Sequence, residues 1–247
     1  MSVTHILQTL LWGYPVPPEM MDPRYPLWLQ TSGGLVLTLA ITGASLCAGA
    51  VLGLCLALLR GVRPEGKDPG ERFAAAVVRH GATGVVELVR GLPVMVWVLL
   101  VFYLPFRLTG WRIPGVVLGI GAFSIYSGVY MCEIIRAGLR AVEPGWIHAA
   151  RVLGLSRSQR LRRIESPLLL RTMLPDIVNL AITVFKDSSV LAVVGVAELT
   201  YTGRQMQMSE PVQYGTVLLV TLVMYWVVST ATAALARVRG VQELTSS

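Results

Sequence analysis

The sequence predicts an all-helical integral membrane protein with about five transmembrane helices. The chain is 54% hydrophobic and only 14% charged. Two runs without any charged residue, 25–59 and 211–236, exceed the ~20 residues that a helix needs to cross the hydrocarbon core of a bilayer. Apolar runs of this length favour helices over the shorter strands of a barrel.

The first two spans are separated by an amphipathic segment. The first span, 31–59, follows Trp28, a residue type that anchors helices at the membrane interface. The second, 91–106, is short and reaches spanning length only if a helix from about Thr83 continues into it. Apolar residues from Phe73 to Leu92 recur at helical spacing, which predicts an interfacial helix that runs into this span. These residues are Phe73, Val77, Val85, Leu88 and Leu92.

The remaining three spans follow from the apolar runs in the second half of the chain. The third, 113–132, ends where Glu133 begins a polar stretch. The fourth, 177–197, is of spanning length but carries Lys186 at its middle, followed directly by an aspartate. The fifth, 214–236, closes the set.

The distribution of Lys and Arg predicts the orientation of the chain. Sixteen of these residues lie in 60–90, 133–175 and the C-terminal tail, whereas only four lie in the segments on the other side of the membrane. Because cytoplasmic loops carry the excess of positive charge, we expect the N-terminus outside and the C-terminus in the cytoplasm. The chain then divides into an outer-surface segment, a membrane domain and a cytoplasmic tail, at 1–30, 31–236 and 237–247.

Other functional classes receive little support. The net charge of +7 is explained by topology, and neither a recognition helix nor a basic strand studded with aromatic residues indicates nucleic-acid binding. The three cysteines lie inside apolar runs, and the three histidines are dispersed, so we expect no metal site. No phosphate-binding GxxxxGK[ST] loop and no GxSxG motif are present, so we expect no catalytic residues and no cofactor on this chain.

The segment 143–167 is rich in arginine and punctuated by turn residues. Pro144 and Gly154 predict the first turn and the end of a short helix. Ser156 and Gln159 have the spacing of a capping box, which starts a second helix. On the first helix, one face carries Trp146, Ala149, Ala150 and Leu153, and another carries His148 and Arg151.

The second helix carries the positive charge, and we expect it to break before Pro167. Its arginines are Arg157, Arg160, Arg162 and Arg163. Charge alone is typical of an anchor that faces anionic lipid. The order of helix, glycine and capped helix favours a shaped surface that docks a partner, because two small alanines let a partner backbone approach closely.

Four stretches, in order and correctly spaced over about 31–236, carry a family resemblance. They are His148-Ala149-Ala150 with Gly154, Ile164 and Pro167; Arg90-Gly91-Leu92-Pro93; Glu133-Ile134-Ile135-Arg136-Ala137-Gly138; and Lys186-Asp187-Ser188-Ser189 followed by Val194-Gly195-Val196-Ala197-Glu198-Leu199. Together they resemble the permease subunits of bacterial ABC importers for polar amino acids. The first stretch is similar to the EAA loop of that family, which docks into a cleft of the ATPase subunit.

The resemblance implies a type I importer permease (MetI-like) architecture in the bacterial cytoplasmic membrane. It implies a homodimer or a pair with a homologous permease, two ATPase subunits that bind ATP and Mg, and an extracytoplasmic amino-acid-binding protein. The implied ATPase-coupling residues are His148, Ala149, Ala150, Arg151, Gly154 and Pro167. His148 replaces the usual acidic residue, and Ser166 replaces the leucine of the usual Leu-Pro, so Arg151 or the neighbouring helix could take over part of the coupling.

The charged pair Lys186 and Asp187 predicts a polar break within the fourth span. Charges at this depth are costly unless they face protein or water, which makes them functional candidates. They could line a translocation pathway, where Ser188 and Ser189 release backbone groups for a zwitterionic substrate. Alternatively, the pair neutralises itself and packs against Glu133 or Arg136. The latter two residues themselves are expected to form a gate or a helix-end ion pair.

The sequence therefore predicts a permease subunit that supplies half of a translocation pathway and a lever, while a separate ATPase supplies the energy. The alternative from another class is a membrane scaffold or regulatory subunit that binds a cytosolic partner through its basic loop and conducts nothing. A proton-driven secondary carrier is a third interpretation. A scaffold does not need the polar break at Lys186–Ser189, and ATP dependence of uptake separates an importer from a carrier.

Overall fold

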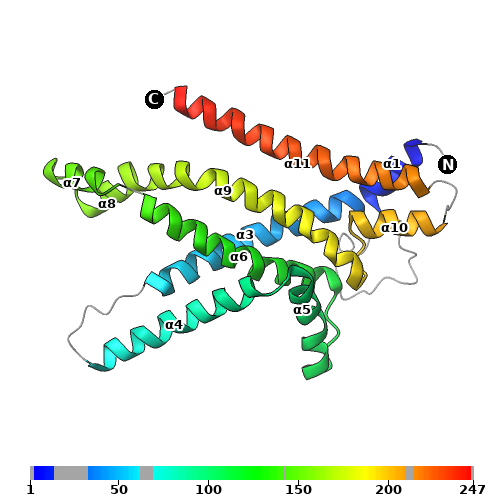
Figure 1. The fold of residues 1–247 in the computed structure, drawn as a ribbon, viewed down its shortest axis with the longest axis horizontal. Coiled ribbons are helices and arrows are strands. Elements are labelled where there is room, and N and C mark those ends of the chain that lie inside the picture. Colours follow the sequence, from blue (N-terminus) through cyan, green and yellow to red (C-terminus); the bar gives the residue numbers. More distant parts are fainter. Residues whose placement is uncertain (1–2, 14–32, 62–68, 142, 210–213, 246–247) are drawn as a thin grey trace.

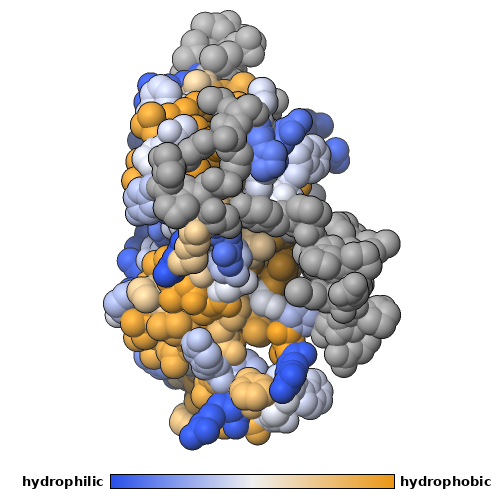
Figure 2. Space-filling model, turned by 90° about the vertical axis from the view of Figure 1, so that its right-hand side faces the viewer, coloured by the Kyte–Doolittle hydropathy of each residue, from blue (hydrophilic) through white to orange (hydrophobic). Residues whose placement is uncertain are grey.

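The protein is an elongated bundle of helices. The computed structural model describes residues 3–13, 33–61, 69–141, 143–209 and 214–245. Long helices run along the major axis, and the described N-terminal and C-terminal helices begin and end toward opposite ends of that axis (Figure 1). Viewed from one end, apolar side chains cover much of the visible surface (Figure 2). Such a surface fits a lipid solvent, because exposed apolar area of this extent is unfavourable in water.

Among the described residues, four helical stretches are long and apolar enough to cross a membrane, and a bent helix pair makes a fifth if the pair is counted as one span. The four are α3 (Gly34–Gly61), α6 (Gly115–Ala141), the stretch Ser158–Val194 and the Tyr214–Arg237 part of α11 (Tyr214–Thr245). These confirm the first, third and fifth predicted spans, although α6 continues nine residues beyond the predicted end at 132.

The second predicted span is wrong in one respect, because the helix from Thr83 does not continue into it. Instead, α4 (Pro69–Gly91) ends and α5 (Val94–Thr109) begins after a bend of 111°. Pro93 stands at the start of α5, and a proline lacks the N–H that would bond back into the preceding helix. A proline also disfavours helical geometry at the residue before it, so α4 ends at Gly91, just ahead of Leu92.

The fourth span begins much earlier than predicted, and the expected break before Pro167 does not occur. The helical stretch runs from α8 (Arg157–Arg160) through a π-helical turn (η2, Leu161–Glu165) into α9 (Ser166–Asp187). The Ser166 N–H bonds to the Leu161 carbonyl across five residues. This wider turn accommodates the proline, since a π-bulge tolerates the missing N–H that an α-helix interior does not.

The main core joins α3 and α6 through glycines. A Cβ at Gly53 would lie 2.6 Å from the Met131 Cβ and 2.8 Å from the Gly128 carbonyl oxygen. A Cβ at Gly49 would lie 2.0 Å from the Ser127 hydroxyl. Small residues at these positions let the two backbones approach closely, which is the usual basis of helix packing in membranes.

Gly53→Val is therefore expected to lower the free energy of unfolding of the bundle by about 1–3 kcal/mol, the usual range for overpacking. Gly43→Val on the same helix is the matched control, because a Cβ at Gly43 meets no atom within 4 Å. The measurement is the thermal midpoint of the detergent-solubilised protein by fluorescence-detected size exclusion. Equal midpoints for the two variants would contradict the close α3–α6 contact.

A second core fixes the N-terminal helix. In α1 (Val3–Trp12), Ile6 and Leu10 are fully buried against residues of α10 (Leu199–Ser209) and α11. Gly34, with φ +56, lets the start of α3 approach this helix, since a Cβ there would lie 2.1 Å from the Leu10 carbonyl oxygen. The described part of the predicted outer segment is thus packed against the bundle, and 14–30 lie outside the described residues.

Candidate functional site

The predicted short helix and its glycine stop are confirmed. α7 (Pro144–Val152) starts with Pro144 in its first turn, and Gly154 follows with φ +72. The Gly154 N–H donates to the Arg151 carbonyl at 3.0 Å, and the Leu155 N–H donates to the Ala150 carbonyl at 3.1 Å. This pair of bonds is a Schellman motif, which needs a left-handed residue and therefore favours glycine.

The predicted capping box is also confirmed. The Gln159 side-chain oxygen accepts the Ser156 N–H at 3.0 Å, and the Ser156 hydroxyl oxygen accepts the Gln159 N–H at 3.3 Å. The reciprocal pair fixes the turn between α7 and α8. An ion pair between Arg160 and Glu165 then spans the π-turn. The segment is consequently held by defined bonds at each step from α7 to α9.

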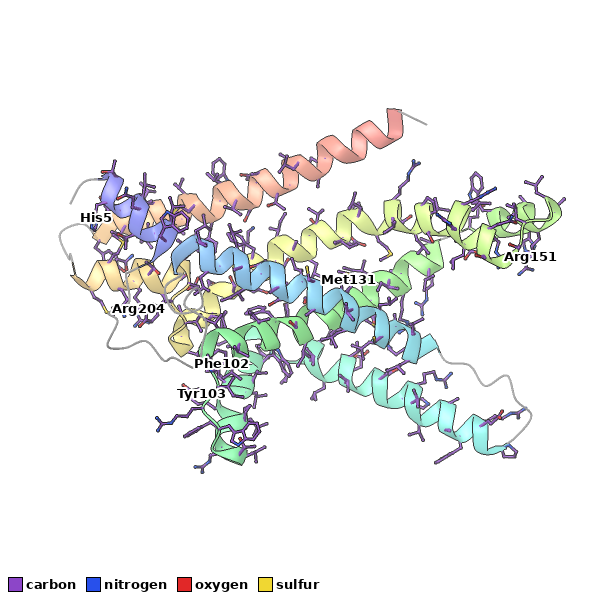
Figure 3. All side chains as sticks on the ribbon, turned by 180° about the vertical axis from the view of Figure 1, so that it is seen from behind. His5, Phe102, Tyr103, Met131, Arg151 and Arg204 are labelled. Atoms are coloured by element: carbon purple, nitrogen blue, oxygen red, sulfur yellow. The ribbon has the colours of Figure 1, made fainter. Side chains whose placement is uncertain are left out.

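α7 forms an exposed tip at one end of the molecule. Arg151 lies there, far from His5 and Arg204 at the opposite end (Figure 3). His148, Ala149 and Arg151 are exposed, whereas Ala150 is buried. Large apolar side chains nearby are exposed as well: Trp146 by 55%, Val152 by 88% and Leu153 by 76%. The predicted docking residues thus surround apolar groups that nothing in the described chain covers.

The structure separates Lys186 from Asp187. The Asp187 carboxylate accepts a hydrogen bond from the Tyr126 hydroxyl on α6 at 3.2 Å. The Lys186 side chain is exposed and lines a cavity of about 440 Å³ between α9 and α11, together with Tyr225 and Ser229. In the described part of the chain, Lys186 forms no ion pair. The alternative in which the two charges neutralise each other and pair with Glu133 or Arg136 is therefore not formed among the described residues in this conformation.

The predicted break follows Asp187, where α9 gives way to a 3-10 helix (η3, Ser188–Val194). Ser188 is fully buried, and its hydroxyl donates to the Phe185 carbonyl at 2.7 Å. In this conformation the hydroxyl thus supports the end of α9. Ser189 is half-buried, and Gly195 with φ +82 ends the 3-10 helix.

Glu133 and Arg136 belong to an ion cluster in the last third of α6. The Glu133 carboxylate pairs closely with Arg60 of α3 and lies 3.8 Å from Arg136 and 4.0 Å from Arg90 of α4. The predicted ion pair of Glu133 and Arg136 is confirmed, but its predicted place at the end of the helix is wrong, because α6 continues eight residues beyond Glu133. Sequence reasoning missed Arg60 as the main partner, because 72 residues of chain separate it from the acid and no local spacing connects the two.

Glu198 is a buried acid to which sequence reasoning gave no role. Its carboxylate accepts the N–H groups of Thr200 at 3.0 Å and Tyr201 at 2.8 Å, which caps α10. The Tyr225 hydroxyl donates to the same carboxylate at 2.9 Å. Burial raises the pKa of the Glu198 carboxyl to about 7, although these hydrogen bonds act in the opposite direction. An N-cap position before a helix was the available signal.

This pKa predicts a pH dependence of stability. The Glu198 carboxyl has a higher pKa in the folded state than the ordinary 4.5, so the folded state holds the extra proton between pH 4.5 and about 7. Stability should therefore fall as the pH rises through this window, by roughly 3 kcal/mol, and level off above it. The measurement is the thermal midpoint at pH values from 5 to 8. In Glu198→Gln this midpoint should change much less with pH than in the wild type. The fall of the midpoint with rising pH should persist in the control Glu87→Gln, because Glu87 is exposed on α4. A fall of the wild-type size in Glu198→Gln would contradict the raised pKa of Glu198.

Comparisons with known proteins agree on one family. Residues 71–238 match the family described as "Binding-protein-dependent transport system inner membrane component". The chain is 33% identical over 185 residues to the glutamine transport system permease protein GlnP of Escherichia coli (strain K12), covering 74% of this chain and 78% of that protein. It is 28% identical over 228 residues to the probable amino-acid ABC transporter permease protein YckA of Bacillus subtilis (strain 168), covering 92% and 94%.

Solved structures share the fold. A chain of an amino acid ABC transporter crystallised with histidines superposes with a TM-score of 0.73 and 29% identity, over 85% of this chain and 92% of that chain. A chain of the MetNI methionine ABC transporter in an inward-facing conformation gives a TM-score of 0.62 at 22% identity, over 89% and 99%. The latter likeness concerns the fold alone.

Proposed function

Because the chain belongs to the family of binding-protein-dependent transport system inner membrane components, we propose that it is the permease subunit of an ATP-driven importer for polar amino acids. It contributes half of a translocation pathway and binds a separate ATPase. The observation that carries this proposal is one continuous helical stretch, from α8 through α9 to η3, with the exposed tip α7 at one end and the Lys186–Asp187 break near the other.

The ATPase would dock on α7. Exposed apolar residues near a rim of polar and charged groups are typical of a protein interface, and α7 presents Trp146, Val152 and Leu153 beside His148 and Arg151. His148 cannot form the salt bridge that an acidic residue would form with a basic partner at this position. Arg151, one turn away and exposed, offers a charge of the opposite sign, which would pair with an acidic residue of the ATPase instead.

The fixed turns make α7 a lever. The Schellman motif at Gly154, the capping box at Ser156 and the ion pair between Arg160 and Glu165 leave no unsupported joint between α7 and α9. A displacement of α7 on ATP binding would therefore move α9, including Pro167 in its first turn. The far end of the same helix carries the polar break, so movement of the ATPase reaches the pathway.

The pathway would pass α9 at this break. Lys186 faces a cavity large enough to admit a small solute, and Asp187 presents a second charge toward α6. The substrate is an amino acid, whose carboxylate and ammonium groups are opposite in charge to Lys186 and Asp187, two side chains that face different sides of α9. Ser188 and Ser189 shape the helix end at this level, while Glu133 and Arg136 form a gate where α3, α4 and α6 meet.

The complete importer would contain two permease subunits, two ATPases that bind ATP and Mg, and an extracytoplasmic binding protein. The second permease is another copy of this chain or a homologue. α7 and the end of α11 lie toward the same end of the bundle (Figure 1), which supports a bacterial cytoplasmic membrane topology with the C-terminus inside and the N-terminus outside.

Affinity purification of the tagged chain from its native membrane in a mild detergent tests this assembly. We expect an ABC ATPase in about equimolar amount, together with a second permease if the pair is unlike. Identification of the co-purified subunits by mass spectrometry is the readout. Recovery of the chain with other cytosolic proteins and without an ATPase would favour a scaffold or regulatory subunit instead.

A further inference from the structure

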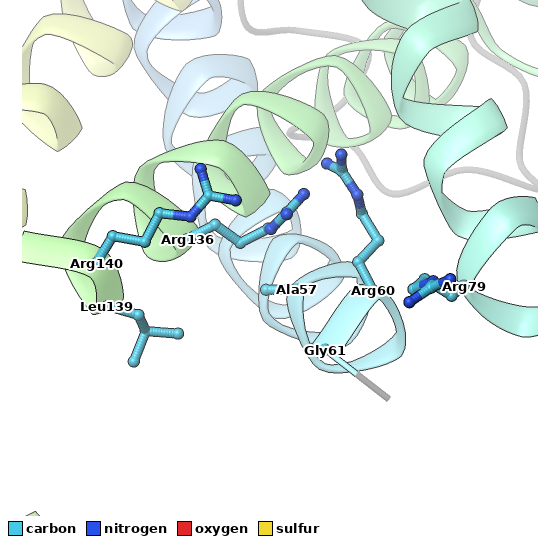
Figure 4. A pocket seen from close by; sticks show the side chains of 7 residues that line it. All are labelled: Ala57, Arg60, Gly61, Arg79, Arg136, Leu139 and Arg140. Atoms are coloured by element: carbon cyan, nitrogen blue, oxygen red, sulfur yellow. The ribbon is translucent and has the colours of Figure 1, made fainter. Parts of the chain in front are cut away.

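A cavity of about 360 Å³ lies where α3, α4 and α6 meet, and it is lined mainly by arginines. Arg60 comes from α3, Arg79 from α4, and Arg136 and Arg140 come from α6 (Figure 4). The other lining residues are small or apolar. Four guanidinium groups from three separate helices thus surround one opening, at the same end of the bundle as α7 (Figure 1).

The positive charge of this cavity is not balanced within the described chain. Glu133 pairs with Arg60, Arg136 and Arg90, so a single carboxylate is shared among three guanidinium groups. Arg79 and Arg140 make no ion pair with any described residue. Like charges held this close repel one another, and an anion in the cavity would relieve that repulsion.

One of the arginines also lacks an acceptor. The Arg60 side chain is only 8% exposed, and its Nε is buried without a hydrogen-bond partner in the described chain. A buried N–H without an acceptor costs free energy, so such groups are normally satisfied by protein, water or a ligand. An anion with several acceptor oxygens would satisfy Nε and the neighbouring guanidinium groups at once.

The cavity opens beside an apolar surface. Leu139 lines it and is 55% exposed. On α3, Leu54 and Leu58 are 50% and 65% exposed, and their spacing places them on the helix face that Ala57 and Gly61 present to the cavity. The apolar face of the α3 span therefore leads directly into the arginine cluster at its last turn. This arrangement has the shape of a phospholipid, with apolar chains along the helix and a charged head at its end.

We propose that this cavity binds the phosphate of an anionic phospholipid headgroup, with the acyl chains lying along Leu54, Leu58 and Leu139. Guanidinium groups match phosphate oxygens in geometry and charge. The position of Arg60 at the end of a membrane span places the cluster at headgroup level, where a lipid phosphate is present at high local concentration. The bound lipid would tie α3, α4 and α6 together, so the stability of this end of the permease would depend on the lipid composition of the membrane.

The test uses the full chain in mild detergent, together with whatever subunits co-purify, and titrates phosphatidylglycerol. Binding is followed by native mass spectrometry and by the thermal midpoint. The test variant is the double substitution Arg79→Gln and Arg140→Gln, which spares the ion pairs of Glu133. We expect the affinity for phosphatidylglycerol to fall at least about tenfold, since each arginine near an anionic lipid surface contributes appreciably to binding.

The matched control is Arg107→Gln with Arg112→Gln, which removes the same charge from exposed positions outside the cavity, at the end of α5 and just after it. We expect this pair to keep the affinity of the wild type within about twofold. Equal losses for both pairs would show unspecific attraction and overturn the proposal. Equal binding of phosphatidylcholine and phosphatidylglycerol would also overturn the proposal. Inorganic phosphate that stabilises the protein as much as phosphatidylglycerol does would overturn it too, because the cavity would then bind a free anion.

Discussion

Gly154→Trp is expected to abolish retention of the ATPase while leaving the membrane bundle folded. Gly154 has φ +72, and the two hydrogen bonds of the Schellman motif depend on that conformation. A tryptophan strains this backbone and adds a large side chain beside Leu153, on the exposed tip. We expect the ratio of ATPase to tagged chain after affinity purification to fall at least about tenfold, since a misplaced or obstructed interface centre typically costs 2 kcal/mol or more.

Gly110→Trp is the matched control for this variant. Gly110 also has a positive φ, +70, and a Cβ at either glycine meets no atom within 4 Å. Gly110 follows α5, however, and is not part of the α7 tip. The control should retain the ATPase at the level of the wild type. Loss of the ATPase in both variants would mean that backbone strain, rather than the tip, is responsible, and full retention in Gly154→Trp would contradict docking at α7.

Asp187→Asn is expected to reduce uptake at least about tenfold at unchanged subunit levels. The substitution keeps the size of the side chain and a partner for the Tyr126 hydroxyl, but it removes the negative charge. An amino acid in transit would then lose a favourable charge interaction, which in a partly dehydrated site contributes more than a kcal/mol. The measurement is the initial rate of uptake of radiolabelled amino acids by cells or vesicles that carry the complete importer.

The control for this substitution lies on the same helix. Asp176→Asn removes an exposed carboxylate from α9, eleven residues before the break. Its uptake rate should remain within about twofold of the wild type. If Asp187→Asn also transported at the full rate with normal subunit levels, Asp187 would be a structural residue, and the pathway would have to pass elsewhere.

Local chemistry explains which predictions succeeded. The glycine stop at Gly154 and the capping box from Ser156 to Gln159 are each determined by residues within five positions of one another. The spans α3 and α11 were predictable because uninterrupted apolar length is itself the physical requirement for crossing a bilayer. Features of this kind are encoded within a short stretch of sequence.

Features that depend on prolines or on distant contacts were not predictable in the same way. Pro93 ends one helix and redirects the chain by 111°, whereas Pro167 is absorbed into a continuous helix by a π-turn. The same residue type thus has opposite outcomes, which tertiary packing decides. Likewise, the separation of Lys186 from Asp187 depends on Tyr126 and on the cavity beside α11, both distant in sequence.

Reconstitution tests the central claim, that this chain forms a pathway driven by a separate ATPase. The purified complex is placed in proteoliposomes with the cognate binding protein at the outer surface, and the uptake of labelled amino acids is followed with ATP inside. We expect uptake that requires ATP, ceases when the ATPase subunit is omitted and persists when a proton ionophore is added. Uptake that continues without ATP and collapses with the ionophore, or no uptake at all by an intact complex, would contradict the account.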